Sequence, residues 1–157
     1  MGKILTWFSR KTRQKHWQQD LNKIFDKYEH SEFEWGSTDC FCFASDCIKA
    51  MTGSGPMDGF KNLYKTEQEA LQLLDQGVTV DTKHYKYNGV IGFWSSFLGE
   101  PKSHGGAMIG DIVLVDIPKH DLVTGVINDT GRFIYLKSIG RNLIEVPIKR
   151  SVYMWGV

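Results

Sequence analysis

The fold of this chain is decided by one stretch, Trp35-Gly36-Ser37-Thr38-Asp39-Cys40-Phe41-Cys42-Phe43-Ala44-Ser45-Asp46. Thr38 or Asp39 can cap a helix here, because either side chain can accept hydrogen bonds from the free N–H groups of a first turn. Cys40 would then lie at the positive end of the helix dipole, which favours the thiolate. The apolar positions that follow at helical spacing are Phe43, Ala44, Cys47, Ile48 and Met51. The stretch therefore predicts a buried helix that begins at a cysteine and stops at Gly53.

The other elements are expected in a clear order, helices first and strands afterwards. A first helix is expected over about 14–29, and a further short helix around 90–98. Thr66 and Glu69 form a capping box, in which each side chain can bind the other's N–H, and the helix that it opens stops at Gly77. Short β-rich runs follow at 112–117, 122–127, 133–137, 143–148 and 152–155. This order predicts an α+β fold, with helices followed by a small antiparallel sheet of about four to six strands.

Composition sets the limits of the functional classes. The chain has 157 residues, a formal net charge of +1 and 41% hydrophobic residues, which suits one domain with a single core. A charge so near zero gives no global field for nucleic acid. The sequence also lacks an apolar run of about 18 residues or more, so no membrane anchor is expected.

The three cysteines all fall on the same predicted helix. Cys40 and Cys47 would be two turns apart, roughly 10 Å, which is too far for a disulfide, and Cys42 projects from another side. A chain kept in a reducing cytosol is the better interpretation. Without a Cys-x-x-Cys or a paired histidine motif, neither a metal site nor a cofactor is expected.

Residues 1–15 differ from the rest of the chain. They contain five basic residues and no acid, interleaved with Ile4, Leu5, Trp7 and Phe8. The segment is either a solvated tail or an amphipathic docking arm. Two large aromatic side chains are unfavourable in a free tail, so we expect a docking arm followed by a single domain over 16–157.

Several short pieces, in this order along the chain, carry a resemblance. They are Trp35-Gly36, Asp39-Cys40, Ala50-Met51-Thr52-Gly53, Tyr64, Gly110-Asp111, Gly125-Val126 and Trp155. Over about 17–157 the chain resembles the NlpC-type papain-like cysteine peptidases that act on cell walls, and most closely a phage and prophage branch of that superfamily. The resemblance implies a papain-like fold with Cys40 in the place of the nucleophile. An ordinary buried core cysteine is the alternative for Cys40.

The chain departs from the family pattern at the general base. Active members carry a histidine at the start of the strand after the Gly-Asp strand, and here that position is Val123 or Thr124. The third polar position of the triad would fall near Lys137 or Ser138. His120 and His104 are the remaining candidates for a base, and both can equally be surface residues.

Two functions of different class follow from the resemblance. One is a virion component of a tail tip or injection apparatus that keeps the peptidase fold without its catalytic histidine. The other is an active cysteine peptidase or amidase that cleaves peptidoglycan peptides during phage entry. Both imply a protein made in the host cytoplasm and located in the virion. Its expected partners are other phage structural proteins, with peptidoglycan as a second candidate.

Overall fold

The computed structural model describes residues 12–77, 89–118 and 122–157. Most of the basic arm, the segment 78–88 and the loop that contains His120 lie outside the described residues. Within this part of the chain there are four α-helices, α2 (Trp17–Glu29), α3 (Cys40–Thr52), α4 (Glu67–Gly77) and α5 (Gly89–Leu98), and two short 3-10 helices, η1 (His104–Gly106) and η2 (Ile148–Arg150). The strands are β1 (Ile112–Asp116), β2 (Leu122–Ile127), β3 (Phe133–Lys137), β4 (Leu143–Pro147) and β5 (Ser151–Trp155).

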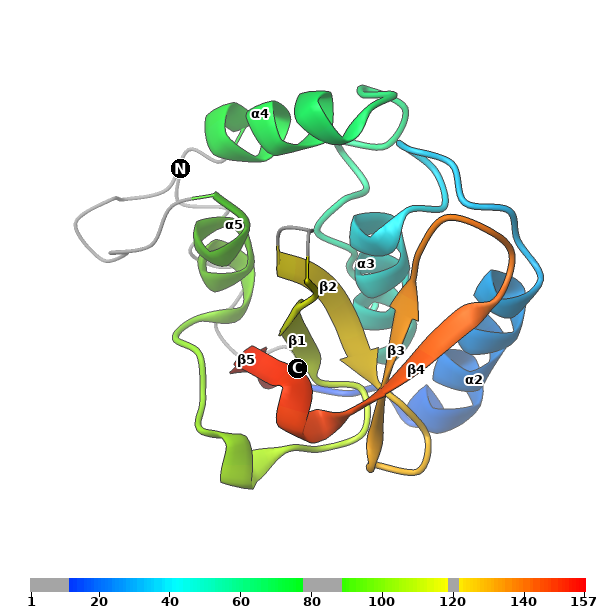
Figure 1. Cartoon of the computed structure of the whole chain (residues 1–157). Helices are drawn as coiled ribbons and strands as arrows, with labels where there is room; N and C mark the ends of the chain where they lie inside the picture. Colours follow the sequence, from blue (N-terminus) through cyan, green and yellow to red (C-terminus); the bar gives the residue numbers. More distant parts are fainter. Residues whose placement is uncertain (1–11, 78–88, 119–121) are drawn as a thin grey trace.

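The strands form one antiparallel sheet in the order β4-β3-β2-β1-β5. The first four strands follow one another as a meander, and β5 returns to pair with the free side of β1. The predicted α+β fold with an antiparallel sheet is therefore confirmed. Figure 1 shows α2 and α3 side by side against the sheet, with α4 across the end of α3 at which that helix begins.

Helix α3 forms the centre of the core, because α2 packs on one side of it and β2 on another. Every residue from Cys40 to Ile48 is buried, which includes the polar Ser45 and Asp46. Each of these two has a partner, as buried polar groups must. Ser45 Oγ accepts from the Met57 N–H at 2.8 Å, and the Asp46 carboxylate accepts from Tyr28 Oη and Lys61 Nζ, each at 2.6 Å. The predicted apolar face is thus only part of the buried surface of this helix.

The helix ends agree with the predicted capping in most respects. Asp39 is the cap of α3, and Gly53 ends the helix in the left-handed conformation at φ 94°. Thr66 Oγ1 accepts from the Glu69 N–H as expected, but the Glu69 carboxylate binds the N–H of Lys65. The capping box predicted that Glu69 would bind the N–H of Thr66, so this half of the prediction was wrong by one residue. The first helix begins at Trp17, after a turn, and not near 14.

The described end of the arm is fastened to the domain. The Arg13 guanidinium donates to the carbonyls of Ile109 and Val157 and lies 3.5 Å from the Asp111 carboxylate. The Gln14 N–H donates to the Met51 carbonyl at 2.7 Å, at the C-terminal end of α3. None of the helices described is both long and apolar enough to span a bilayer.

Candidate functional site

Asp39 fixes the start of the cysteine helix. Its Oδ1 accepts from the Cys42 N–H at 2.9 Å, and its Oδ2 accepts from the Gly36 N–H and from Tyr64 Oη, each at 2.7 Å. The side chain is fully buried. These bonds satisfy one of the free N–H groups of the first turn and bind the helix to two other segments.

Gly36 is required by the same arrangement. Its φ is +91°, and a Cβ at this position would collide with the carbonyl oxygen of Tyr64. The Asn62 N–H also donates to the Gly36 carbonyl at 2.8 Å. Three pieces of the family-like pattern therefore lie together and hold the N-terminus of α3 in place. They are Trp35-Gly36, Asp39-Cys40 and Tyr64.

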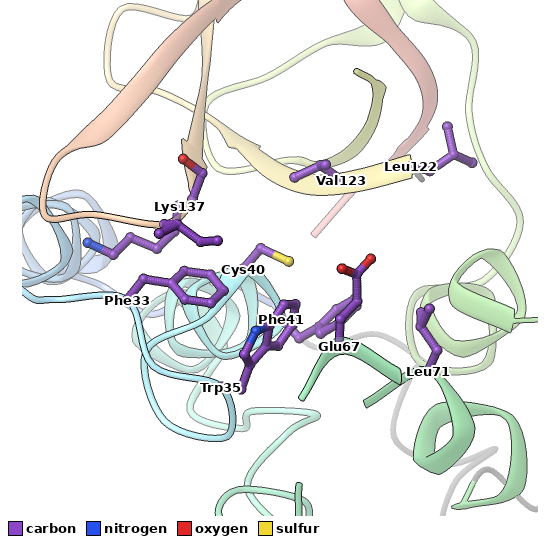
Figure 2. A pocket seen from close by; sticks show the side chains of 11 residues that line it. Phe33, Trp35, Cys40, Phe41, Glu67, Leu71, Leu122, Val123 and Lys137 are labelled. Atoms are coloured by element: carbon purple, nitrogen blue, oxygen red, sulfur yellow. The ribbon is translucent and has the colours of Figure 1, made fainter. Parts of the chain in front are cut away.

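Cys40 is the first residue of α3, and its side chain is 7% exposed. Figure 2 shows its sulfur directed into the open space between Val123 and Glu67. The backbone N–H of Thr124 favours the thiolate and by itself would lower the pKa of Cys40. Burial and the nearby Asp39 carboxylate act the other way, and together they raise the pKa of the Cys40 thiol well above its usual range. The expected lowering by the helix N-terminus is outweighed, so this thiol is neutral at pH 7.

A pocket of about 290 Å³ opens over this sulfur. It is lined by Phe33, Trp35, Cys40, Phe41, Glu67, Leu71, Leu122, Val123, Lys137, Ser138 and Ile139. The lining comes from α3, α4, β2, the end of β3 and the loop before α3, so the sequence gives no local sign of it. Trp35 is half-buried in this lining and packs edge-to-face on Phe33, with ring centroids 4.9 Å apart.

The expected base position lies in this pocket. Val123 contributes to the lining, whereas the Thr124 hydroxyl is buried and accepts from Trp94 Nε1 at 3.1 Å. Neither side chain can accept a proton from a thiol. His120 lies outside the described residues, and so does the side chain of His104, whose backbone begins η1. Among the described side chains, no histidine lines the pocket.

Lys137 is buried at the expected third position, but its ammonium serves the framework. Nζ donates to the carbonyl oxygens of Tyr28, Ser31 and Arg141. Figure 2 shows this nitrogen directed away from Cys40. Burial lowers the pKa of Lys137, and the three carbonyls compensate for the lost hydration. Lys137 therefore completes the C-terminal end of α2 and joins it to the turn after β3.

Glu67 is the acidic residue that sequence reasoning missed. It is the first residue of α4 and the only carboxylate in the described lining of the pocket. Its carboxyl group points toward the same space as the Cys40 sulfur (Figure 2). No motif marks Glu67, because only the packing of α4 across the start of α3 brings it there. Nowhere in the described part of the chain do three His, Cys, Asp or Glu residues gather as metal ligands.

The described lining of the pocket provides groups that can contact a ligand. They include apolar and aromatic side chains, one carboxylate and a neutral thiol.

The model of a family described as a domain of unknown function, DUF6950, matches residues 12–157. The match spans nearly the whole chain, so the chain belongs to this family. None of the curated proteins matches the chain.

Proposed function

We propose that this protein is a phage virion component of a tail tip or injection apparatus, built on a papain-like fold of the NlpC type that has lost its catalytic histidine. The observation that carries the proposal is the pairing of Cys40 with Val123 across one pocket. The proposal takes the position of Cys40 at a helix start as inherited from a peptidase and the valine as the replacement of its base.

The state of the thiol supports this conclusion. Nucleophilic catalysis by cysteine needs a thiolate or an adjacent base that takes the proton. Burial and the Asp39 carboxylate raise the pKa of Cys40, and no histidine is among the described residues that line its pocket. A protein in this state keeps the shape of a peptidase cleft without the means to turn over a substrate.

The arm supports a place in an assembly. Its root is held by Arg13 and Gln14 beside Met51 and Val157, so whatever the arm contacts is held at a fixed point of the domain. The residues before this root carry Trp7 and Phe8 between basic side chains. Burial of such side chains contributes roughly 1.5–3 kcal/mol each, which offsets the ordering of a few residues at about 1–2 kcal/mol each. Other structural proteins of the particle are the proposed partners.

Two measurements test the proposal. Purified protein is incubated with peptidoglycan, and the soluble fragments are analysed by mass spectrometry beside a Cys40→Ala control. We expect no release that depends on Cys40. In the second measurement, particles that carry the chain without residues 1–11 are compared with wild-type particles by quantitative mass spectrometry. The truncated chain is expected to be depleted, and normal incorporation would remove the arm as the anchor.

An active cysteine hydrolase is the second candidate function. Its support is the backbone N–H of Thr124 beside the Cys40 sulfur, because it favours the thiolate that would attack a peptide bond. In that case the enzyme would be a peptidase or amidase that acts on peptidoglycan peptides. Release of fragments that is lost in both Cys40→Ala and His120→Ala would establish it.

A further inference from the structure

The pocket over Cys40 has the character of a docking site for side chains. Phe33, Trp35 and Val123 give it an apolar interior, and Ile139 at its rim is 85% exposed. An exposed apolar residue continuous with an apolar pocket is typical of an interaction surface. The volume of about 290 Å³ is at the lower end for ligand sites, which suits one or two side chains.

The charged groups in the pocket lining indicate which kind of side chain the pocket can bind. The Glu67 carboxylate is directed into the space over Cys40 (Figure 2), and no described residue forms an ion pair with it. Lys137 is the one cation among the described lining residues, and its ammonium donates to three backbone carbonyls. The pocket therefore fits a segment that places a basic side chain close to an aromatic or aliphatic one.

The chain itself carries a segment of this kind. Its sequence is Ile4-Leu5-Thr6-Trp7-Phe8-Ser9-Arg10-Lys11. We propose that Trp7 and Phe8 of one copy of this protein dock in the Cys40 pocket of a second copy, with Arg10 next to Glu67. This deepens the proposed function by naming a partner, and it rests on that function in one respect, that the pocket is not a working active site.

The point at which the arm is attached to the domain favours docking in the pocket of a second copy over docking in the pocket of the same molecule. The Gln14 N–H is bound to the Met51 carbonyl, and Met51 is eleven residues, about 16 Å, along α3 from Cys40. Trp7 and Gln14 are seven positions apart in the sequence, so the chain between them spans at most about 25 Å along a straight line. The direct path beside α3 is filled, since residues Cys40 to Ile48 are all buried. A route around these packed residues is longer than the roughly 16 Å along the helix axis and takes up most of the reach of the arm, so we assign the arm to the pocket of a second copy.

Such a contact is head-to-tail, because the arm and the pocket are different surfaces of the same chain. Contacts of this kind produce rings when the rotation closes and chains of copies when it does not. The inference therefore predicts self-association of the purified protein that depends on both the arm and the pocket.

The test uses full-length protein and sedimentation velocity over a range of concentrations. The arm variant carries Trp7→Ser and Phe8→Ser, and the pocket variant carries Glu67→Lys, a change on an exposed residue. Wild-type protein is expected to gain mass with concentration, and each variant to associate at least about tenfold more weakly. An equimolar mixture of the two variants is expected to recover a dimer, because it still contains one intact arm and one intact pocket. Glu100→Lys, the same charge change on an exposed residue outside the pocket lining, is the matched control and is expected to associate like wild type.

A double variant distinguishes a loss of association from a loss of folding. Arg10→Glu combined with Glu67→Lys restores the charge pair and is expected to recover association that either change alone weakens. The proposal is overturned if wild-type protein is monomeric throughout, if the mixture of arm and pocket variants stays monomeric, or if Glu100→Lys weakens association as much as Glu67→Lys. Peptidoglycan cleavage by the same wild-type sample would refute the proposed function separately, whatever the association shows.

Discussion

The hydroxyl of Tyr64 donates to the carboxylate of Asp39 over 2.7 Å, although 25 residues separate them in the chain. Both groups are buried, and the same carboxylate holds the first turn of α3 through the Cys42 N–H. The bond therefore connects the start of the cysteine helix to the loop that leads into α4. Through this connection the two walls of the pocket, Cys40 on one side and Glu67 on the other, are kept in register.

Tyr64→Phe removes this bond without removing the ring. We expect a loss of about 1–3 kcal/mol in the free energy of unfolding, because the buried carboxylate loses a donor. Asp39→Ala is expected to cost more, since it also frees the N–H groups of Gly36 and Cys42. Chemical denaturation of both single variants and the double variant measures the coupling, and a double-variant loss equal to the sum of the single losses would argue against it.

Labelling of Cys40 by a thiol reagent should be slow at pH 7 and should rise with pH. The reagent reacts with the thiolate, and burial together with Asp39 keeps the pKa of Cys40 high. Peptide mass spectrometry reports the labelling of each cysteine in the same wild-type molecule. Cys42 serves as the internal comparison, since its pKa is raised to about 12 and it does not line the pocket. Fast labelling of Cys40 that is independent of pH above about 6 would contradict the neutral thiol and would favour an active cysteine hydrolase.

Stability should fall in alkaline solution. The folded protein keeps the thiols of Cys42 and Cys47 protonated, because burial raises the pKa of each above the value of about 8.5 for a free thiol. The folded state then binds more protons than the unfolded state above about pH 8.5, so the free energy of unfolding decreases as pH rises through that value. Each thiol contributes a slope of at most about 1.4 kcal/mol per pH unit.

The measurement is urea unfolding between about pH 7 and 10.5, with Cys47→Ala as the comparison. Cys47 is fully buried, and its variant lacks one of the raised groups, so its stability should decline less steeply than that of wild type. Equal slopes for the two proteins would show that this thiol does not contribute.

Replacement of Lys137 by methionine should destabilise the fold and not only alter the pocket. The change leaves the carbonyls of Tyr28, Ser31 and Arg141 without their shared donor, and a loss of about 2–4 kcal/mol is expected. Lys149→Met, at an exposed position, is the control and should change stability by less than about 0.5 kcal/mol. A Lys137→Met protein as stable as wild type would mean that the ammonium is not needed by the framework.

Local patterns along the chain were sufficient to predict the helices and strands and their order. The spacing of apolar residues and the signals at Asp39, Gly53 and Thr66 predicted α3 and the start of α4, because a cap and a helical period are local properties of the chain. The β-rich runs predicted the five strands to within a residue or two, since turns separate them. The resemblance left Val123 and Thr124 open as the position of the expected base, and only the structure shows that Val123 is the one that lines the pocket.

Tertiary structure alone decided what surrounds the cysteine. Burial around the start of α3 raises the pKa of the Cys40 thiol, and this burial depends on α2, the sheet and the loop before α4, none of which is encoded in the helix itself. The pocket brings Phe33 and Trp35 together with Glu67 and Ile139, residues that are up to 106 positions apart. Lys137 lies at the expected third triad position, but its ammonium points to the end of α2. A buried cation needs hydrogen-bond acceptors, and the carbonyl oxygens at the end of this helix provide them. Long-range packing determines which side chains are buried and which groups they contact. Neither property can be derived from a local pattern of residues along the chain.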